Sequence, residues 1–239
     1  MLEVLASSRK GLTLSQVARS LEVARSSAFY ILNTLEKSGY VHRGSARGRY
    51  TFTPKLFELA ARSLTGLGIR ERAAPFLRAL MDQTGLTVHL AAISQNEVVV
   101  IDKIAPAAIQ PLATWVGKRL PIHCTGAGKS LMAFLPEEQI EYHIKQGLTR
   151  YNDNTIALAG RLREDLSRVR ANGFAVDDEE ETIGLRCIGV PIFDESNQVV
   201  AAVSIAGTTA QINEDNLGRL AGIVKQTGES ISASLRVRV

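Results

Sequence analysis

The fold of the N-terminal third is decided by residues 13–52, TLSQVARSLEVARSSAFYILNTLEKSGYVHRGSARGRYTF. Thr13 and Gln16 form a capping box, in which each side chain satisfies a free amide at the start of a helix. Apolar residues then recur at helical spacing, at Leu14, Val17, Ala18 and Leu21. This pattern predicts a short amphipathic helix that begins directly after Thr13.

A second helix is predicted over Arg25–Lys37, after a break of three residues. One side of it carries Ala28, Ile31, Leu32 and Leu35, and the other carries Ser26, Tyr30, Asn33 and Lys37. Two short helices with so brief a turn are typical of a helix-turn-helix, whose second helix enters the major groove of DNA by its N-terminus. We expect the DNA-facing residues to be Arg25, Ser26, Ser27, Tyr30 and Asn33. A plain helical hairpin in a bundle is the alternative.

The segment that follows distinguishes these two interpretations. Residues 40–43 and 49–52 are strand-like, and the glycine-rich tip between them is basic. A β-hairpin directly after a recognition helix is a wing, and Arg43, Arg47 and Arg49 suit contact with phosphates or the minor groove. Each arginine alone would be read as a solvated charge, but together they favour a winged helix-turn-helix.

Positive charge is concentrated at the N-terminal end of the chain. Residues 1–66 carry ten basic and four acidic side chains, whereas the whole chain has 28 basic and 24 acidic ones. A basic head on a nearly neutral body indicates that the head alone meets a polyanion, here double-stranded DNA. A basic surface that is merely solvated is the alternative on charge alone.

Composition excludes several classes of protein. The 239 residues are 45% hydrophobic and 22% charged, as in globular proteins, and no apolar run is long enough to span a membrane. The first residues lack the features of a signal peptide. Two cysteines, Cys124 and Cys187, cannot make a disulfide framework. We therefore expect a cytoplasmic protein with no membrane contact.

A helical linker is predicted after the wing. Thr53 as N-cap and Pro54 at the first helical position start a helix whose inner face is predicted to be Leu56, Leu59, Ala60 and Ser63. Glycines at 66 and 68 break it, and a helical pattern resumes over residues 69–83. We expect a DNA-binding domain over residues 1–53, linker helices over 54–83 and a further domain over 84–239.

The C-terminal two thirds mix strands with helices. Strands are predicted over residues 87–92, 98–103, 174–176, 187–193 and 199–205, and helices over 127–134, 136–146, 157–172 and 213–235. Hairpins with segregated helices favour an antiparallel sheet with helical cover over a Rossmann fold. The expected fold class of the chain is α+β.

Two stretches of this region resemble the IclR family of transcription regulators. They are LPIHCTGAGKS at 120–130 and GFAVDDEEETIGLRC at 173–187, and residues 188–207 extend the likeness. GLTLS at 11–15 is similar to the family's approach to its first motif helix. The resemblance runs from end to end of the chain. It implies a winged helix-turn-helix, a linker helix and a GAF-like effector domain, assembled as a homodimer or homotetramer.

The sequence departs from the family pattern at three places. It begins inside what is normally the first helix, so we expect that helix to be incomplete. Phe29 and Tyr30 stand where a His-Arg pair is frequent, so the operator need not resemble others in the family. Ala206 replaces a serine that often follows Ser204 by two residues. The loss of this hydroxyl predicts a wider pocket that favours an effector with an apolar or aromatic portion.

The resemblance also implies the residues of an effector pocket, which are Ile109, Leu112, Gly126, Ala127, Asp177, Leu185, Cys187 and Ser204. Glycines at the start of the 127–134 helix would let a ligand approach free backbone amides, which suits a small carboxylate. A nucleotide-binding P-loop is excluded by spacing, because position 123 is His123 rather than glycine.

Plainer roles remain open for several of these residues. Ile109, Leu112 and Leu185 are equally compatible with a core, and Cys187 with a small buried hydrophobe. His123 and Cys124 could bind a metal but lack obvious partners. The acidic run 177–181 is expected to be a solvated turn in which Asp177 alone faces inward.

The sequence therefore predicts an effector-controlled regulator of a palindromic operator, without a cofactor and without enzymatic activity, in which residues 54–83 couple the two ends. One alternative is an enzyme with an accessory DNA-binding module, but no Ser/His/Asp set, carboxylate pair or metal constellation emerges. A purely architectural DNA-binding protein is the other, and it leaves the glycine-rich helix start and Asp177 unexplained.

Overall fold

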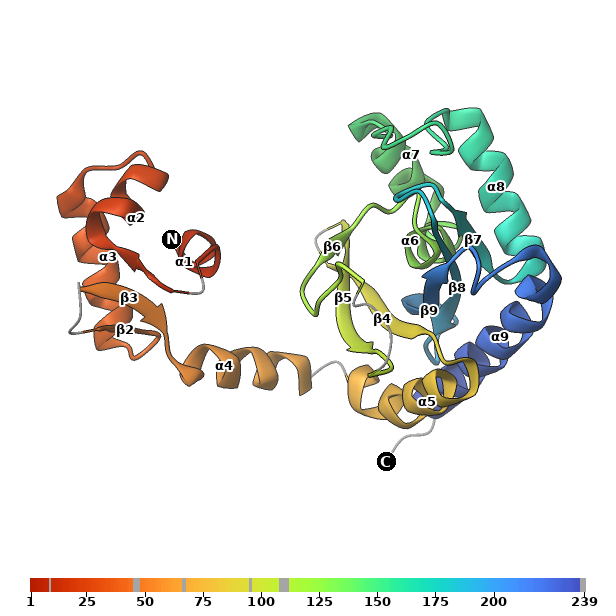
Figure 1. Ribbon diagram of the computed structural model, residues 1–239, viewed down its shortest axis with the longest axis horizontal. Coiled ribbons are helices and arrows are strands. Elements are labelled where there is room, and N and C mark those ends of the chain that lie inside the picture. The colour runs from red at the N-terminus through yellow and green to blue at the C-terminus, as the bar shows by residue number, and fades with distance from the viewer. Residues whose placement is uncertain (9, 45–47, 66–67, 95, 108–111, 237–239) are drawn as a thin grey trace. The chain divides into compact units, whose positions relative to one another are not determined.

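The computed structural model describes residues 1–8, 10–44, 48–65, 68–94, 96–107 and 112–236, with residues 60–65 described by their backbone alone. The chain divides into two compact units, Met1–Leu67 and Gly68–Val239 (Figure 1). The division falls inside the predicted linker. Its first helix belongs to the first unit and its second helix to the second unit.

The first unit is a winged helix-turn-helix, as predicted. Its elements are α1 (Leu2–Ala6), β1 (Leu12–Thr13), α2 (Leu14–Ser20), α3 (Arg25–Lys37), β2 (Val41–Arg43), β3 (Arg49–Phe52) and α4 (Pro54–Thr65). The capping box starts α2 where expected, because Thr13 N donates to Gln16 Oε1 at 2.9 Å and Gln16 N donates to Thr13 Oγ1 at 3.4 Å. The strands pair antiparallel in the order β1-β3-β2, and the two-residue β1 was too short to predict.

The core of this unit corrects two predictions of inward-facing residues. It consists of Leu5, Val17, Ala18, Ala28, Leu32, Val41 and Tyr50. Ile31 is 46% exposed, because the inner stripe of α3 is narrow and follows Ala28, Leu32 and Leu35. Leu59 is also exposed, as is Phe57 at 75%, because no described side chain of α4 enters the core. The predicted Ala60 and Ser63 lie outside the described side chains.

The second unit is built on an antiparallel sheet, again as predicted. Its strands are β4 (Thr87–Ser94), β5 (Glu97–Ile104), β6 (Arg119–Leu120), β7 (Ala175–Asp178), β8 (Leu185–Phe193) and β9 (Val199–Thr208). They lie in the order β6-β5-β4-β9-β8-β7. The helices are α5 (Ile69–Thr84), α6 (Gly126–Met132), α7 (Glu137–Gln146), α8 (Ala159–Asn172) and α9 (Glu214–Arg236). None of the helices described is long and apolar enough to cross a membrane.

The two faces of this sheet have different partners, and the side-chain alternation of β9 shows the division. Ala201, Val203 and Ile205 pack in the core formed with α5 and α9. Ala202 points the other way and packs with Ala127 and Leu131 of α6. Figure 1 shows α5 and α9 together on one side of the sheet and α6 on the other, with α7 and α8 beyond it.

Close backbone packing fixes α6 against the sheet. A Cβ added to Gly126 would lie 3.1 Å from Gly189 N, and one added to Gly189 of β8 would overlap the backbone of Gly126. A Cβ at Gly128 would lie 2.5 Å from Ile122 O. Helix-to-sheet packing therefore requires glycine at 126 and 189, and contact with the segment before α6 requires it at 128.

Candidate functional site

The recognition helix α3 presents its predicted DNA-facing residues to solvent. Arg25, Ser26 and Ser27 are exposed, Tyr30 is 70% exposed and Asn33 is half-buried. The N-cap residue, Ala24, provides no side-chain hydrogen bond, so no cap side chain covers the first amides of the helix. The N-terminal end of α3 is thus a polar surface with one large aromatic side chain.

The wing arginines differ in their contacts. The Arg43 guanidinium lies 5.7 Å from the centre of the Tyr50 ring, and its side chain is otherwise exposed. Arg49 Nη1 donates to Gly11 O at 2.8 Å and so ties β3 to the segment before β1. Arg47 lies outside the described residues. Arg43 is therefore available to a partner, whereas Arg49 already has a structural role.

A cavity of about 130 Å³ lies in the second unit, between the sheet, the start of α6 and two loops. We call it the sensor cavity. Its lining contains the predicted Leu112, Gly126, Ala127, Leu185, Cys187 and Ser204, and also Ala206, which the sequence placed in the pocket as the position that lacks a hydroxyl. The lining residues that were not predicted are His89, Ala113, Thr114, Lys118, Leu120, Thr125, Glu181 and Thr182. Ile109 lies outside the described residues.

Strand register explains the floor of the sensor cavity. His89 of β4 is directly opposite Ser204 of β9, and Cys187 of β8 is directly opposite Ala206. Asp177 lies on the edge strand β7, where it is directly opposite Cys187 of β8. It is one strand further from the sensor cavity and does not line the cavity. Side-chain alternation in β4 could have predicted that His89 lies on the other face of the sheet from the core residues Val88 and Leu90. Its pairing with Ser204 could not be predicted, because cross-strand register has no local sequence signal.

Asp177 is buried behind this wall and acts as a local brace. Its Oδ1 accepts a hydrogen bond from Glu180 N at 2.8 Å. Burial raises the pKa of Asp177 to about 7, although the hydrogen bond from Glu180 favours the carboxylate. Asp177 therefore organises the turn that follows β7.

Residues 112–118 form a roof over the sensor cavity, and we call them the roof segment. His89 Nε2 lies 2.7 Å from Thr114 Oγ1, and Lys103 Nζ donates to the carbonyl oxygens of Thr114 at 2.7 Å and Leu112 at 3.1 Å. Burial and the neighbouring lysines lower the pKa of His89 to about 4, so its imidazole is neutral at pH 7.

At the other end of the roof segment, Lys118 reaches toward the opposite wall. Its Nζ donates to Ala113 O at 3.0 Å and lies 3.6 Å from Glu181 Oε1. Both side chains are partly exposed, at 23% for Lys118 and 26% for Glu181. This ion pair joins the roof segment to the loop that follows β7.

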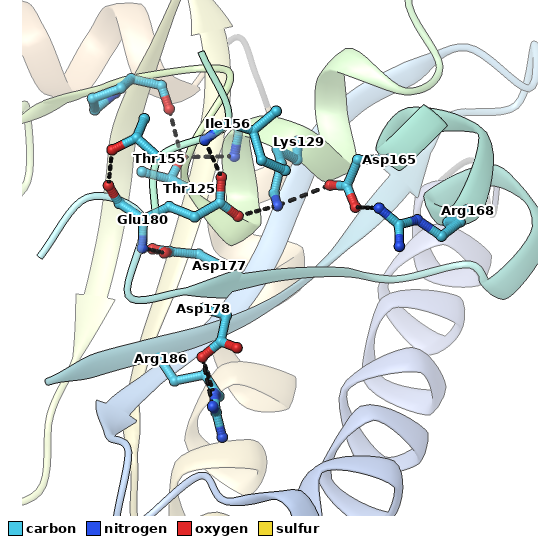
Figure 2. A network of polar contacts seen from close by, with 12 residues as sticks. Thr125, Lys129, Thr155, Ile156, Asp165, Arg168, Asp177, Asp178, Glu180 and Arg186 are labelled. Atoms are coloured by element: carbon cyan, nitrogen blue, oxygen red, sulfur yellow. Dashed lines mark hydrogen bonds and ion pairs between the residues drawn. The ribbon is translucent and has the colours of Figure 1, made fainter. Parts of the chain in front are cut away.

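A second ion cluster lies behind α6, away from the sensor cavity (Figure 2). Lys129 of α6, only 1% exposed, forms ion pairs with Glu180 and, at 2.9 Å, with Asp165 of α8. Burial alone would lower the pKa of Lys129, but the two carboxylates outweigh it and raise that pKa. Arg168 pairs with the other oxygen of Asp165 at 3.1 Å.

The backbone of Glu180 is also fully engaged in this cluster. Its carbonyl oxygen accepts from Thr155 Oγ1 at 2.7 Å and from Asn152 Nδ2 at 3.1 Å. The expectation that Asp177 alone of the acidic run faces inward is therefore wrong. Glu180 is buried too, because a lysine 51 positions earlier in the chain neutralises it.

Cys124 and His123 are buried, and Cys187 is half-buried in the wall of the sensor cavity. Burial raises the pKa of both Cys124 and Cys187, with Asp177 adding to the shift, and both thiols are free. His123 Nε2 lies 3.0 Å from Thr149 O. Within the described part of the chain, no three His, Cys, Asp or Glu residues are grouped so as to hold a metal ion.

Comparison with known proteins agrees with this architecture. The family model of the bacterial transcriptional regulator IclR C-terminal domain matches residues 61–233, and that of the IclR helix-turn-helix domain matches residues 1–45. The transcriptional repressor IclR of Escherichia coli is 30% identical over 97% of this chain and 86% of its own length. The repressor AllR of the same organism is 31% identical over 100% of the chain and 88% of its own length.

Solved structures show the same fold. The IclR protein of Thermotoga maritima matches 99% of this chain and 96% of its own with a TM-score of 0.83 and 32% identity. An IclR homologue of Microbacterium hydrocarbonoxydans, in complex with 4-hydroxybenzoate, covers 98% and 95% with a TM-score of 0.88, and at 24% identity this likeness concerns the fold. On the family models and these relatives together, the chain belongs to the IclR family of DNA-binding transcriptional regulators.

Proposed function

We propose that this chain regulates transcription by binding an operator through α3 and the wing, and that a small carboxylate in the sensor cavity sets its affinity for that operator. The observation that carries the proposal is the sensor cavity itself. It brings six of the eight residues that the family resemblance implies to the lining of one cavity, together with a cationic side chain, Lys118.

On the DNA side, the proposal rests on exposure and charge. Arg25, Ser26, Ser27 and Tyr30 project from the N-terminal half of α3, where base edges and phosphates would lie. Asn33 is further along the same helix. We assign Arg43 and Arg47 of the wing to phosphate or minor-groove contact. Arg49, also predicted to contact DNA, would act mainly by holding the wing to Gly11.

The size of the sensor cavity limits the effector. A cavity of about 150 Å³ holds a benzene molecule, and this one measures about 130 Å³. The apolar walls include Leu112, Leu185 and Ala206, and hydroxyls come from Thr114 and Ser204. These features fit a small acid whose apolar or aromatic portion lies against Ala206.

Helix α6 contributes less to anion binding than the sequence suggested. It has seven residues, and the amide of Gly128 already donates to Thr125 Oγ1 at 3.1 Å. The amides of Gly126 and Ala127 are left at its start. We therefore assign the main attraction for a carboxylate to a side chain of the cavity wall.

We propose a regulator rather than an enzyme. A nucleophilic cysteine needs a lowered pKa, whereas burial raises the pKa of Cys187 well above its usual value. The neutral His89 faces a threonine hydroxyl rather than a carboxylate. The enzyme alternative therefore has no activated group among the described residues of the sensor cavity.

We further propose a homodimer or homotetramer that binds a palindromic operator, since a two-fold assembly presents two copies of α3 to two half-sites. Repression is the proposed mode, by analogy with the named repressors above. The two free thiols fit a reducing cytoplasm.

Thermal unfolding of the full chain against glyoxylate, lactate, benzoate and 4-hydroxybenzoate tests the effector class. An acid present at about 100 times its Kd adds roughly 2.7 kcal/mol, which raises the Tm by several degrees. The shift should be lost in Ser204→Ala and kept in Ser230→Ala, a matched change on an exposed face of α9. A set of acids without effect would contradict the carboxylate proposal. Glyoxylate binding far better than the ring acids would contradict the role assigned to Ala206.

A separate experiment tests the DNA contacts. Arg43→Ala or Arg47→Ala should weaken binding to all DNA sequences and should reduce the slope of log affinity against log salt concentration by about 1. Tyr30→Ala should instead change the preference among sequences. Equal losses on every sequence in all three variants would contradict this assignment.

A further inference from the structure

We propose that Lys118 and Glu181 are the pair that sets the charge selectivity of the sensor cavity: Lys118 binds the carboxylate of the effector, and Glu181 is the partner that it leaves. The inference deepens the proposed function and rests on it.

Only two side chains in the described lining of the sensor cavity carry a charge at neutral pH, Lys118 and Glu181. His89 also lines it but is neutral, because its pKa is lowered to about 4. The two charges cancel, so an incoming carboxylate is attracted by one wall and repelled by the other. Selectivity therefore depends on whether the lysine exchanges its partner.

Three lysines lie near the sensor cavity, and two of them are committed elsewhere. Lys103 donates to two carbonyl oxygens of the roof segment, those of Leu112 and Thr114. Lys129 is buried behind α6 between Glu180 and Asp165. Neither can turn to a ligand without breaking these contacts.

Lys118 can exchange one of its partners. Its ammonium has three donors. It donates to Ala113 O at 3.0 Å, lies 3.6 Å from Glu181, and is 5.8 Å from the centre of the Trp115 ring. The separation of 3.6 Å is beyond hydrogen-bond distance and both side chains are partly exposed, so this ion pair is weaker than a buried, hydrogen-bonded one. A carboxylate that offers shorter, better aligned hydrogen bonds can therefore replace Glu181 at little cost.

Exchange also has a mechanical consequence. The Lys118–Glu181 pair joins the roof segment to the loop after β7. A ligand carboxylate on Lys118 replaces this direct link by one that runs through the ligand. Ligand binding in the sensor cavity therefore changes how the roof segment is held to the loop after β7.

The test measures binding of two acids and their neutral amides, benzoate with benzamide and lactate with lactamide, by titration calorimetry on the full chain. Lys118→Met should weaken binding of the acids at least tenfold, and Glu181→Gln should tighten it about threefold or more. Binding of the amides should change less than twofold in both variants. The matched controls are Lys145→Met and Glu164→Gln, exposed positions on α7 and α8, which should change nothing.

Opposite signs for the two variants, confined to the acids, would establish the inference. If the acids bind but both variants shift their affinity in the same direction, or not at all, the inference is overturned while the proposed function stands. If the amides follow the acids in both variants, the effect is one of shape rather than charge, and the inference is again overturned. If no acid binds the unaltered chain, the carboxylate proposal fails and the inference fails with it.

Discussion

Glu180 and Glu181 are neighbours in the chain, and each pairs with a lysine, yet the two pairs lie in different surroundings. Glu180 meets Lys129 behind α6, where both side chains are buried. Glu181 meets Lys118 at the wall of the sensor cavity, where about a quarter of each side chain is exposed. Similar chemistry therefore gives a fixed cluster on one side and an exchangeable contact on the other, and burial makes the difference.

The buried pair of Lys129 and Glu180 keeps its partners because no water is available to stabilise either charge. Water cannot replace a partner of Lys129, so removal of that partner leaves a bare charge in the interior. The cluster joins α6, α8 and the turn after β7, as Figure 2 shows, so it holds the back of the sensor cavity in place. The front of the cavity can then respond to a ligand against a rigid frame.

The largest effect is expected for Lys129→Met. This change strands Glu180 in the interior and should lower the free energy of unfolding of the second unit by about 3–5 kcal/mol. Far-ultraviolet circular dichroism follows the denaturation, because Trp115, the chain's one tryptophan, is already 61% exposed in the folded state. The double change Lys129→Met with Glu180→Met should recover much of the loss. A cost below about 1 kcal/mol for the single change would show that the cluster is not a brace.

Gly189→Ala should have the next largest effect, because it acts on the same rigid side through packing. The new Cβ would overlap backbone atoms of Gly126, which cannot rotate away, so α6 must move at a cost of about 1–3 kcal/mol. Gly222→Ala is the matched control, since a Cβ there meets nothing within 4 Å and should stabilise α9 by roughly 0.5–1 kcal/mol. Equal stability of the two variants would contradict close packing as the reason for Gly189.

A third experiment uses pH, because two buried groups near the cavity titrate with opposite signs. The pKa of Asp177 rises from 3.8 to about 7 on folding, so its contribution to stability falls as pH rises through this range. The pKa of His89 falls from 6.5 to about 4, so its contribution rises with pH over nearly the same range. These two contributions to stability therefore oppose each other in the unaltered chain.

Single substitutions should reveal how stability depends on pH through each of the two groups. Between pH 5 and 7, Asp177→Asn should become more stable with pH and His89→Gln less stable, each by on the order of 1–2 kcal/mol. Denaturation at several pH values gives the two curves. Parallel curves for both variants would mean that these groups do not carry the pH dependence.

The smallest effect is expected at the exchangeable pair. Lys118→Met and Glu181→Gln should each change the free energy of unfolding by less than about 1 kcal/mol, because a partly exposed ion pair adds little. The same denaturation curves as for Lys129→Met provide the measurement. A loss as large as that of Lys129→Met would remove the distinction between the two pairs.

The sequence predicts those parts of the fold that depend on local patterns. The capping box of Thr13 and Gln16 locates the start of α2, and alternation of side chains locates β4, β5, β8 and β9 to within a few residues. β1 and β6 escape prediction because two residues have no period, and they are defined only by pairing with β3 and β5.

The candidate site is less predictable because it depends on contacts between distant residues. Lys129 lies within a run, GAGKSLM, whose pattern does not show that its lysine is buried. Its burial depends on Glu180, which belongs to a run that looks like a solvated turn. Lys118 likewise acquires a role only because the roof segment brings it to Glu181.

The two thiols of the folded sensor differ in their access to solvent. Cys124, just before α6, is buried, whereas Cys187 is half-buried in the wall of the sensor cavity. The pKa of both thiols is raised, so both react slowly with an alkylating reagent. Labelling of Cys124 requires an opening of the structure, so its rate counts such openings. Labelling of Cys187 requires only an empty cavity, so its rate falls when a ligand fills that space.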